Sequence, residues 1–304
     1  MTRTGTTPTN LRRALRREIP STIGLLADEQ DFAAMRRYRT FLFDDHATYL
    51  RQVEALLKTL ARQGGHTTVA LFDPEEYAAW CAETATEPDR PASRSRFTAH
   101  LAATGARVTY TGQPLAALLP ELVDTAVHQA TWEYATTVLA TAGDCASCGK
   151  DIGKAAYERA ARLLVRLLEA AGPGAHHLVC SVPTADDQLL AVLHTDGTPP
   201  PEDTTGIGFA TESATEFTAV LAAGIALAAP GGLVLRTTAP DTPDRLHGWR
   251  LTDGTLTPLT EAEVFSAYCT DARTGEPLSP EPGVEYRAGF PLAPGPDDDW
   301  TTHH

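Results

Sequence analysis

Three carboxylates and a histidine follow two predicted strands, and together they could bind a divalent cation. Asp44, Asp45 and His46 follow one short apolar run, and Asp73 follows another. Ligands of open parallel sheets bind beyond the carboxyl ends of the strands, so these side chains would share one edge, called here the acidic rim. Carboxylates are preferred Mg²⁺ ligands, and the ion could hold a phosphate. In such a site Asp44, Asp45 and Asp73 would bind the ion, and His46 would act as a general acid or base.

The same acids are also typical of helix starts. The segment 73–76, Asp-Pro-Glu-Glu, combines an N-cap carboxylate with a first-turn proline and two acids near the positive end of the helix dipole. Asp45 could equally cap the helix that contains Tyr49. Because capping alone explains both acids, the sequence favours it over metal binding.

The second candidate site is the pair Cys145 and Cys148, just before a predicted helix that starts at Asp151. A Cys-x-x-Cys pair can provide half of a tetrahedral zinc site. Small residues between the sulfurs and glycines on both sides would let backbone N–H groups point at the thiolates. His176 and Cys180 follow on a predicted strand, but four residues of strand span ~13 Å, so one ion cannot bind both. Another element, such as the one carrying His128, would have to complete the site.

Two other interpretations of this pair stay open. The thiols could be a redox couple, since a helix N-terminus lowers a thiolate pKa. However, the preceding element is a predicted helix, and Cys148 lies three residues before Asp151, so the dipole should act weakly. The cysteines could also be ordinary residues of a tight turn. If the pair is functional, we expect it to bind zinc.

A glycine pair, Gly206 and Gly208, precedes another predicted helix and could offer backbone N–H groups to an anion. The third glycine of the dinucleotide-binding fingerprint is absent, and no strand clearly precedes the pair. We interpret this segment as a turn followed by a helix N-cap. The sequence contains no nucleophile elbow, HExxH, P-loop or kinase motif.

The composition is that of a globular protein, with 304 residues, 42% hydrophobic and 21% charged. A net charge of −14 argues against general binding to nucleic acid or to an anionic membrane surface. Residues 1–40 differ from the rest of the chain, because they contain eight arginines and only four acidic residues. A basic arm at this end of the chain could bind an acidic partner. The start of the chain lacks the apolar core of a signal peptide, and the five cysteines are an odd number, so we expect a reducing cytoplasm.

The elements that carry the first candidate site predict an α/β fold. A strand, a helix, a strand and a second helix follow one another, which favours parallel pairing with a right-handed crossover. We therefore predict a three-layer, Rossmann-like domain with a short parallel sheet over residues 38–142, after a basic helical arm at 1–37. Its expected strands are 39–43, 66–72 and 105–111.

The second half of the chain predicts an α+β domain over residues 150–292. It should contain an antiparallel hairpin, a buried Ala-rich helix, further strands and a last helix opened by a capping box at Thr260 and Glu263. The expected elements are 176–182, 188–194, 212–229, 233–238, 246–251, 260–268 and 284–290. An acidic, flexible tail is predicted at 293–304.

Two functions from different classes follow. The favoured one is a ligand-sensing or protein-interaction protein without catalytic activity, whose partner is a small molecule or a protein. The alternative is a divalent-metal-dependent enzyme that acts on a phosphorylated small molecule at the acidic rim. Neither function needs a membrane, and only the arginine-rich arm could contact nucleic acid. The candidate cofactors are zinc at Cys145 and Cys148 and Mg²⁺ at the rim.

Overall fold

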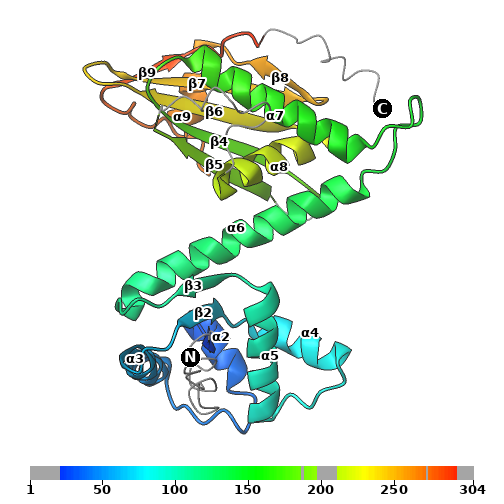
Figure 1. The fold of residues 1–304 in the computed structure, drawn as a ribbon. Coiled ribbons are helices and arrows are strands. Elements are labelled where there is room, and N and C mark those ends of the chain that lie inside the picture. Colours follow the sequence, from blue (N-terminus) through cyan, green and yellow to red (C-terminus); the bar gives the residue numbers. More distant parts are fainter. Residues whose placement is uncertain (1–20, 186–187, 197–210, 272, 293–304) are drawn as a thin grey trace, which may run out of the picture. The chain divides into compact units, whose positions relative to one another are not determined.

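The computed structural model describes residues 21–185, 188–196, 211–271 and 273–292, which form a mixed α/β structure (Figure 1). These described residues contain eight helices and two mixed sheets, so the predicted α/β class is confirmed. The chain divides into two compact units, residues 1–129 and 130–304, called unit 1 and unit 2. The division lies inside one continuous helix, α6, Leu115–Thr141, whereas the sequence suggested a junction near Asp144. No helix in the described ranges is long and apolar enough to cross a membrane.

Unit 1 is built on a three-stranded sheet of order β1-β2-β3. β1 runs parallel to β2, and β3 runs antiparallel to β2. One strand pair of the sheet is therefore parallel, but it is not the predicted pair of 39–43 with 66–72, and the Rossmann-like sheet is not supported. The elements of unit 1 before α6 are β1 Ser21–Leu25, α2 Glu29–Met35, α3 His46–Arg62, β2 Thr67–Leu71, α4 Pro74–Glu83, α5 Pro91–Thr104 and β3 Arg107–Thr109.

The first parallel strand is β1, and the prediction of a strand at 39–43 was wrong. Residues 39–43 form a loop in which Leu42 is 84% exposed. Phe41 and Phe43 are in ring contact there, with centroids 5.1 Å apart. In β1, a Cβ at Gly24 would lie 2.8 Å from the ring of Phe72, so glycine allows the close approach of that ring.

The predicted N-terminal arm at 1–37 is also corrected in part. Residues 21–35 form β1 and α2, and Leu25, Leu26, Phe32 and Met35 are buried in the core of unit 1. The apolar residues of this segment therefore belong to the same core as residues of α3 and β2, and the segment is not a separate arm. Residues 1–20, where most of the arginines of the predicted arm lie, are outside the described residues.

Unit 2 is built on a six-stranded sheet of order β5-β4-β6-β7-β8, in which β9 also pairs with β7. All pairings are antiparallel except β7–β9. The elements after α6 are α7 Ile152–Ala171, β4 Ala175–Pro183, β5 Gln188–Thr195, α8 Glu212–Ala226, β6 Gly231–Thr238, β7 Asp244–Thr252, β8 Thr255–Pro258, α9 Glu261–Tyr268 and β9 Val284–Arg287.

Helices α7 and α8 pack on each other, and α8 also contacts β4 and β5 (Figure 1). The predicted hairpin is confirmed as β4–β5, and the Ala-rich helix is buried over nearly its whole length as α8. Both halves of the capping box at Thr260 and Glu263 are present. The turn between α6 and α7 contains Cys145 and Cys148.

Candidate metal-binding sites

At the acidic rim, Asp45 and Asp73 are helix N-caps. The backbone N–H and hydroxyl of Thr48 donate to the two carboxylate oxygens of Asp45, both at 2.7 Å. These hydrogen bonds hold the pKa of Asp45 below its usual value. Asp73 Oδ1 accepts from the N–H groups of Glu75 and Glu76 at 2.7 and 3.1 Å. The predicted capping roles of both residues are confirmed.

His46 anchors the start of α3 to the end of β1. Its Nε2 lies 3.1 Å from the carbonyl oxygen of Leu26, so Nε2 carries the proton and donates it. The imidazole also packs against the rings of Phe32 and Tyr49, with centroid distances of 5.4 and 6.1 Å. Asp44 lies exposed in the bend before α3.

The carboxylates that do share the ends of the parallel strands are a different set. Asp28 follows β1 and caps α2 by accepting from the N–H of Asp31 at 2.8 Å. Burial, followed by the charges of Asp28, Asp73 and Glu75, raises the pKa of Asp31. Asp28, Asp31, Asp73 and Glu75 are called here the acidic cluster. Sequence reasoning missed Asp28 and Asp31 because β1 was not recognised as a strand.

The closeness of the four carboxylates in the acidic cluster does not by itself make a cation-binding site. The acidic cluster lies at the starts of two helices, where carboxylates are stabilised by backbone N–H groups. Among the described residues, no three His, Cys, Asp or Glu side chains are placed to hold one metal ion. The geometry of the rim therefore matches helix capping better than ion coordination.

The second candidate site is a hydrogen-bonded turn, residues 143–152, called here the cysteine turn. The N–H of Cys145 donates to the carbonyl of Lys150, and the N–H of Gly149 donates to the carbonyl of Cys145, both at 2.8 Å. Asp144 and Asp151 form an antiparallel bridge around this core. Gly149 has a φ of 67°, a conformation that glycine adopts readily.

Hydrogen bonds converge on the Cys145 sulfur. Ser147 Oγ lies 3.0 Å from Cys145 Sγ, and the backbone N–H groups of Ser147 and Cys148 also point at it. The Cys148 thiol makes a further hydrogen bond to the same sulfur. These donors, the Ser147 hydroxyl first, lower the pKa of Cys145 to about 6. Cys148 is exposed, whereas Cys145 is buried, so only the Cys148 thiol is directly open to a ligand from outside.

The downstream residues considered as further ligands are occupied or buried. Both ring nitrogens of His176 have partners, with Thr237 Oγ1 at 3.1 Å and the carbonyl of Gly172 at 3.0 Å. Cys180 is buried, which raises its pKa to about 12. The inference that one ion cannot bind both His176 and Cys180 stays a prediction.

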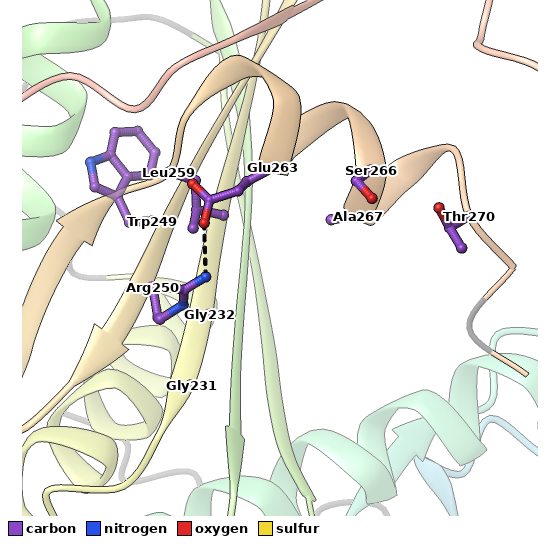
Figure 2. A pocket seen from close by; sticks show the side chains of 9 residues that line it. All are labelled: Gly231, Gly232, Trp249, Arg250, Leu259, Glu263, Ser266, Ala267 and Thr270. Carbon is purple, nitrogen blue, oxygen red and sulfur yellow. Dashed lines mark hydrogen bonds and ion pairs between the residues drawn. The ribbon is translucent and has the colours of Figure 1, made fainter. Parts of the chain in front are cut away.

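A pocket of about 480 Å³ lies between α9 and the strands β6 and β7 (Figure 2). Its charged residues, Arg250 and Glu263, form an ion pair at 3.0 Å. Sequence reasoning missed this pocket, because its lining comes from β6, β7, α9 and the segments beside α9, which only the fold brings together. The lining residues are Gly231, Gly232, Trp249, Arg250, Leu259, Glu263, Ser266, Ala267 and Thr270. The other predicted anion site, Gly206 and Gly208, lies outside the described residues, and Thr211 caps the following helix α8.

Part of the chain matches a known family model. Residues 10–113 match the model of a family described as a domain of unknown function (DUF8829). No curated protein and no solved structure matches the chain. The family match ends before α6, so it includes the acidic cluster and excludes the cysteine turn and the pocket of unit 2.

Proposed function

We propose that the chain is a protein-interaction protein without catalytic activity of its own, and that its cysteine turn binds zinc. The proposal is carried by the geometry of the cysteine turn, which backbone hydrogen bonds close around Cys145 and Cys148 and in which Ser147 Oγ lies 3.0 Å from Cys145 Sγ. Thiolates held in this way, with backbone N–H groups around them, are typical of half of a tetrahedral zinc site. Because Cys148 is exposed, the other half can come from a binding partner.

The number of ligands supports a role in interaction. Catalytic zinc sites have three protein ligands and a water, whereas structural sites have four protein ligands. The cysteine turn provides two, and the described part of the chain brings no third ligand to it. Zinc at this turn would therefore join two surfaces.

The test is metal analysis of protein purified without a histidine tag, together with a thiol titration before and after chelation. We expect bound zinc, and two thiols that react freely only after the metal is removed. Cys148→Ser should abolish zinc binding, while the matched variant Ser147→Ala, which keeps both sulfurs, should retain it. Near-zero zinc with two readily alkylated thiols would refute the proposal. A Cys145–Cys148 disulfide formed under mild oxidant would favour the redox interpretation instead.

Small-molecule sensing is a second part of this proposal, and the pocket beside α9 is where a ligand would bind. A Cβ at Gly232 would meet only the carbonyl of Trp249, at 3.9 Å, so a larger side chain there would extend into open space. Gly232→Leu should thus fill the pocket without unfolding unit 2. A thermal-shift screen of small molecules should give hits that this variant loses. Hits that bind both proteins equally would exclude the pocket.

The alternative function is a divalent-metal-dependent enzyme acting on a phosphorylated small molecule. It is favoured by the acidic cluster, because Asp28, Asp73 and Glu75 lie close enough to Asp31 to add to the effect of burial in raising its pKa, and closely placed carboxylates attract a cation. Calorimetric titration with Mn²⁺ tests this alternative. Binding that Asp73→Asn abolishes would support the enzyme, and no binding at millimolar Mn²⁺ would exclude it.

The proposal also includes the layer arrangement of unit 1 and the location of the protein in the cell. A three-layer arrangement of unit 1 is supported by α3 and α5, both of which contact strands of its sheet. A location in the reducing cytoplasm is supported by the five cysteines, none of which forms a disulfide in the described part of the chain.

A further inference from the structure

We propose that His177 and His194 form a metal site that binds one divalent ion of the nickel, copper and zinc group. The two residues lie directly opposite each other in the antiparallel pair of β4 and β5. This site is separate from the cysteine turn and does not depend on the zinc binding proposed there.

The nitrogens of the two imidazoles are spaced like two ligands of one ion. The Nδ1 of His177 lies 3.0 Å from the Nδ1 of His194 and 3.1 Å from its Nε2. Metal–nitrogen bonds of ~2.0–2.1 Å that meet at square-planar or tetrahedral angles place their nitrogens about 2.8–3.4 Å apart. By distance, either nitrogen of His194 can therefore share an ion with the Nδ1 of His177.

Both imidazoles are accessible to an ion from solvent. Their chain neighbours Leu178 and Leu193 are buried in the core of unit 2, so the histidines lie on the other face of the sheet. His194 is exposed, and His177 is partly exposed. Because β4 is paired with both β5 and β6, the sheet fixes the positions of the two ligands. An ion bound here would cross-link β5 to β4.

The protonation of the pair suits metal binding at neutral pH. Burial, followed by the charges of His194 and Arg236, lowers the pKa of His177 below its usual value, so this ring is neutral at pH 7. Without an ion, one ring donates its proton to the other across the distance of 3.0 Å. A shift of that proton to the other nitrogen of the same ring leaves both lone pairs available to a metal.

The arginine beside the pair does not exclude a cation. Arg236 of β6 lies opposite His177 in the register of the sheet. Its guanidinium forms ion pairs with Asp244 at 2.6 Å and with Glu281 at 2.8 Å. Two carboxylates therefore offset the positive charge that would otherwise repel the ion.

The type of ligand selects the class of ion. Imidazole nitrogens suit Zn²⁺, Cu²⁺ and Ni²⁺, whereas Mg²⁺ and Ca²⁺ prefer oxygen ligands. No third His, Cys, Asp or Glu side chain completes a metal-binding group within the described ranges, so water would fill the other positions around the ion.

The experiment titrates Ni²⁺ into untagged, full-length protein and follows binding by calorimetry. The other candidate ligands are first removed in a background that carries Cys148→Ser, His303→Gln and His304→Gln. In this background we expect one bound Ni²⁺ per chain. Either His177→Gln or His194→Gln should weaken the binding at least tenfold, because one imidazole cannot chelate the ion.

The matched control is His66→Gln, which removes an exposed histidine of unit 1 and should bind Ni²⁺ as the background protein does. Because one ion would share both ligands, the double variant His177→Gln, His194→Gln should lose no further measurable binding. Ni²⁺ should also raise the thermal midpoint of the background protein and of His66→Gln, but not that of the pair variants. Circular dichroism verifies that each variant is folded.

Three results would overturn the proposal. The first is absence of binding at millimolar Ni²⁺, and the second is equal affinity in the background protein and both pair variants. The third is two bound ions, each lost with one of the histidines, because the rings would then bind separate ions. None of these results bears on the zinc proposed at the cysteine turn, because the background lacks the Cys148 thiol.

Discussion

The acidic cluster of unit 1 and the cysteine turn of unit 2 both place anions next to backbone N–H groups, with different results. In unit 1 the carboxylates of Asp28 and Asp73 each accept from the first turn of their own helix. In unit 2 the Cys145 and Cys148 sulfurs also contact each other. Backbone N–H groups stabilise an anion in either setting. A metal site additionally needs two anions that face one point, and the zinc site proposed at the cysteine turn requires that arrangement of its two sulfurs.

The largest effect on the cysteine turn is expected from a substitution of Gly153. This residue of α7 lies against the backbone of Leu139 in α6, next to the turn. In Gly153→Ala the new Cβ would collide with the Leu139 backbone, which cannot move as a flexible side chain does. We expect unit 2 to lose about 3 kcal/mol of stability, at the upper end of overpacking effects, and to lose zinc. Denaturant unfolding and metal analysis measure the two effects.

The matched control is Gly143→Ala in the same turn. A Cβ there meets nothing within 4 Å, but the φ of 74° strains any side chain. The expected cost is about 1 kcal/mol, with zinc retained. Equal losses in the two variants would mean that the helix crossing does not control the turn.

In unit 1, the capping role of Asp73 is tested by the variant Asp73→Ala. Loss of the N-cap should destabilise unit 1 by about 1 kcal/mol, while Asp73→Asn, which still accepts from Glu75 and Glu76, should stay within a few tenths. Midpoints of denaturant unfolding give both values. An unchanged midpoint in Asp73→Ala, together with loss of ligand binding, would assign Asp73 to a functional site instead.

In unit 2, the effect of the Ser147 hydroxyl on the Cys145 pKa is tested by the variant Ser147→Ala in metal-free, reduced protein. The Ser147 hydroxyl is the main cause of the low Cys145 pKa, about 6, so its removal should move the thiolate titration to higher pH. Ultraviolet absorbance of the thiolate follows this titration. Because folding lowers this pKa from 9.0, the thiolate adds stability that rises between pH 6 and 9 and is lost as pH falls through 6. An unmoved titration would assign the shift to the backbone N–H groups.

The smallest expected effect is that of Asp31→Asn. Burial and three neighbouring acids raise the pKa of Asp31, so its charge opposes folding at neutral pH. The variant should be more stable by about a few tenths of a kcal/mol at pH 7, since screened charges at the surface act weakly. This gain should vanish in acid, where Asp31 is protonated in the fold. A loss of stability at pH 7 would mean that the charge has a favourable partner, such as a cation.

Features set by nearby residues could be predicted from the sequence. The caps at Asp45 and Asp73, the capping box at Thr260 and Glu263, the β4–β5 hairpin and the buried helix α8 were all predicted and are confirmed. Each depends on contacts within a few residues or on one periodic apolar pattern, so the sequence alone determined them.

The residues that share the rim were decided by tertiary structure. The aromatic run at 39–43 has strong strand propensity, yet β1, with Gly24 in its interior, pairs with β2. Propensity could not reveal that Gly24 allows Phe72 to approach, because Phe72 lies 48 residues further along the chain. Asp28 and Asp31 were overlooked for the same reason.

The cysteine pair shows both kinds of determination in one site. Its spacing and its glycines predicted a turn that could bind zinc, which is local information. The burial of Cys180 and the occupied ring nitrogens of His176 come from sheet pairing and core packing. Residue spacing therefore determined that two sulfurs lie together, whereas the fold decided which other ligands could reach them, because long-range packing sets which side chains remain exposed.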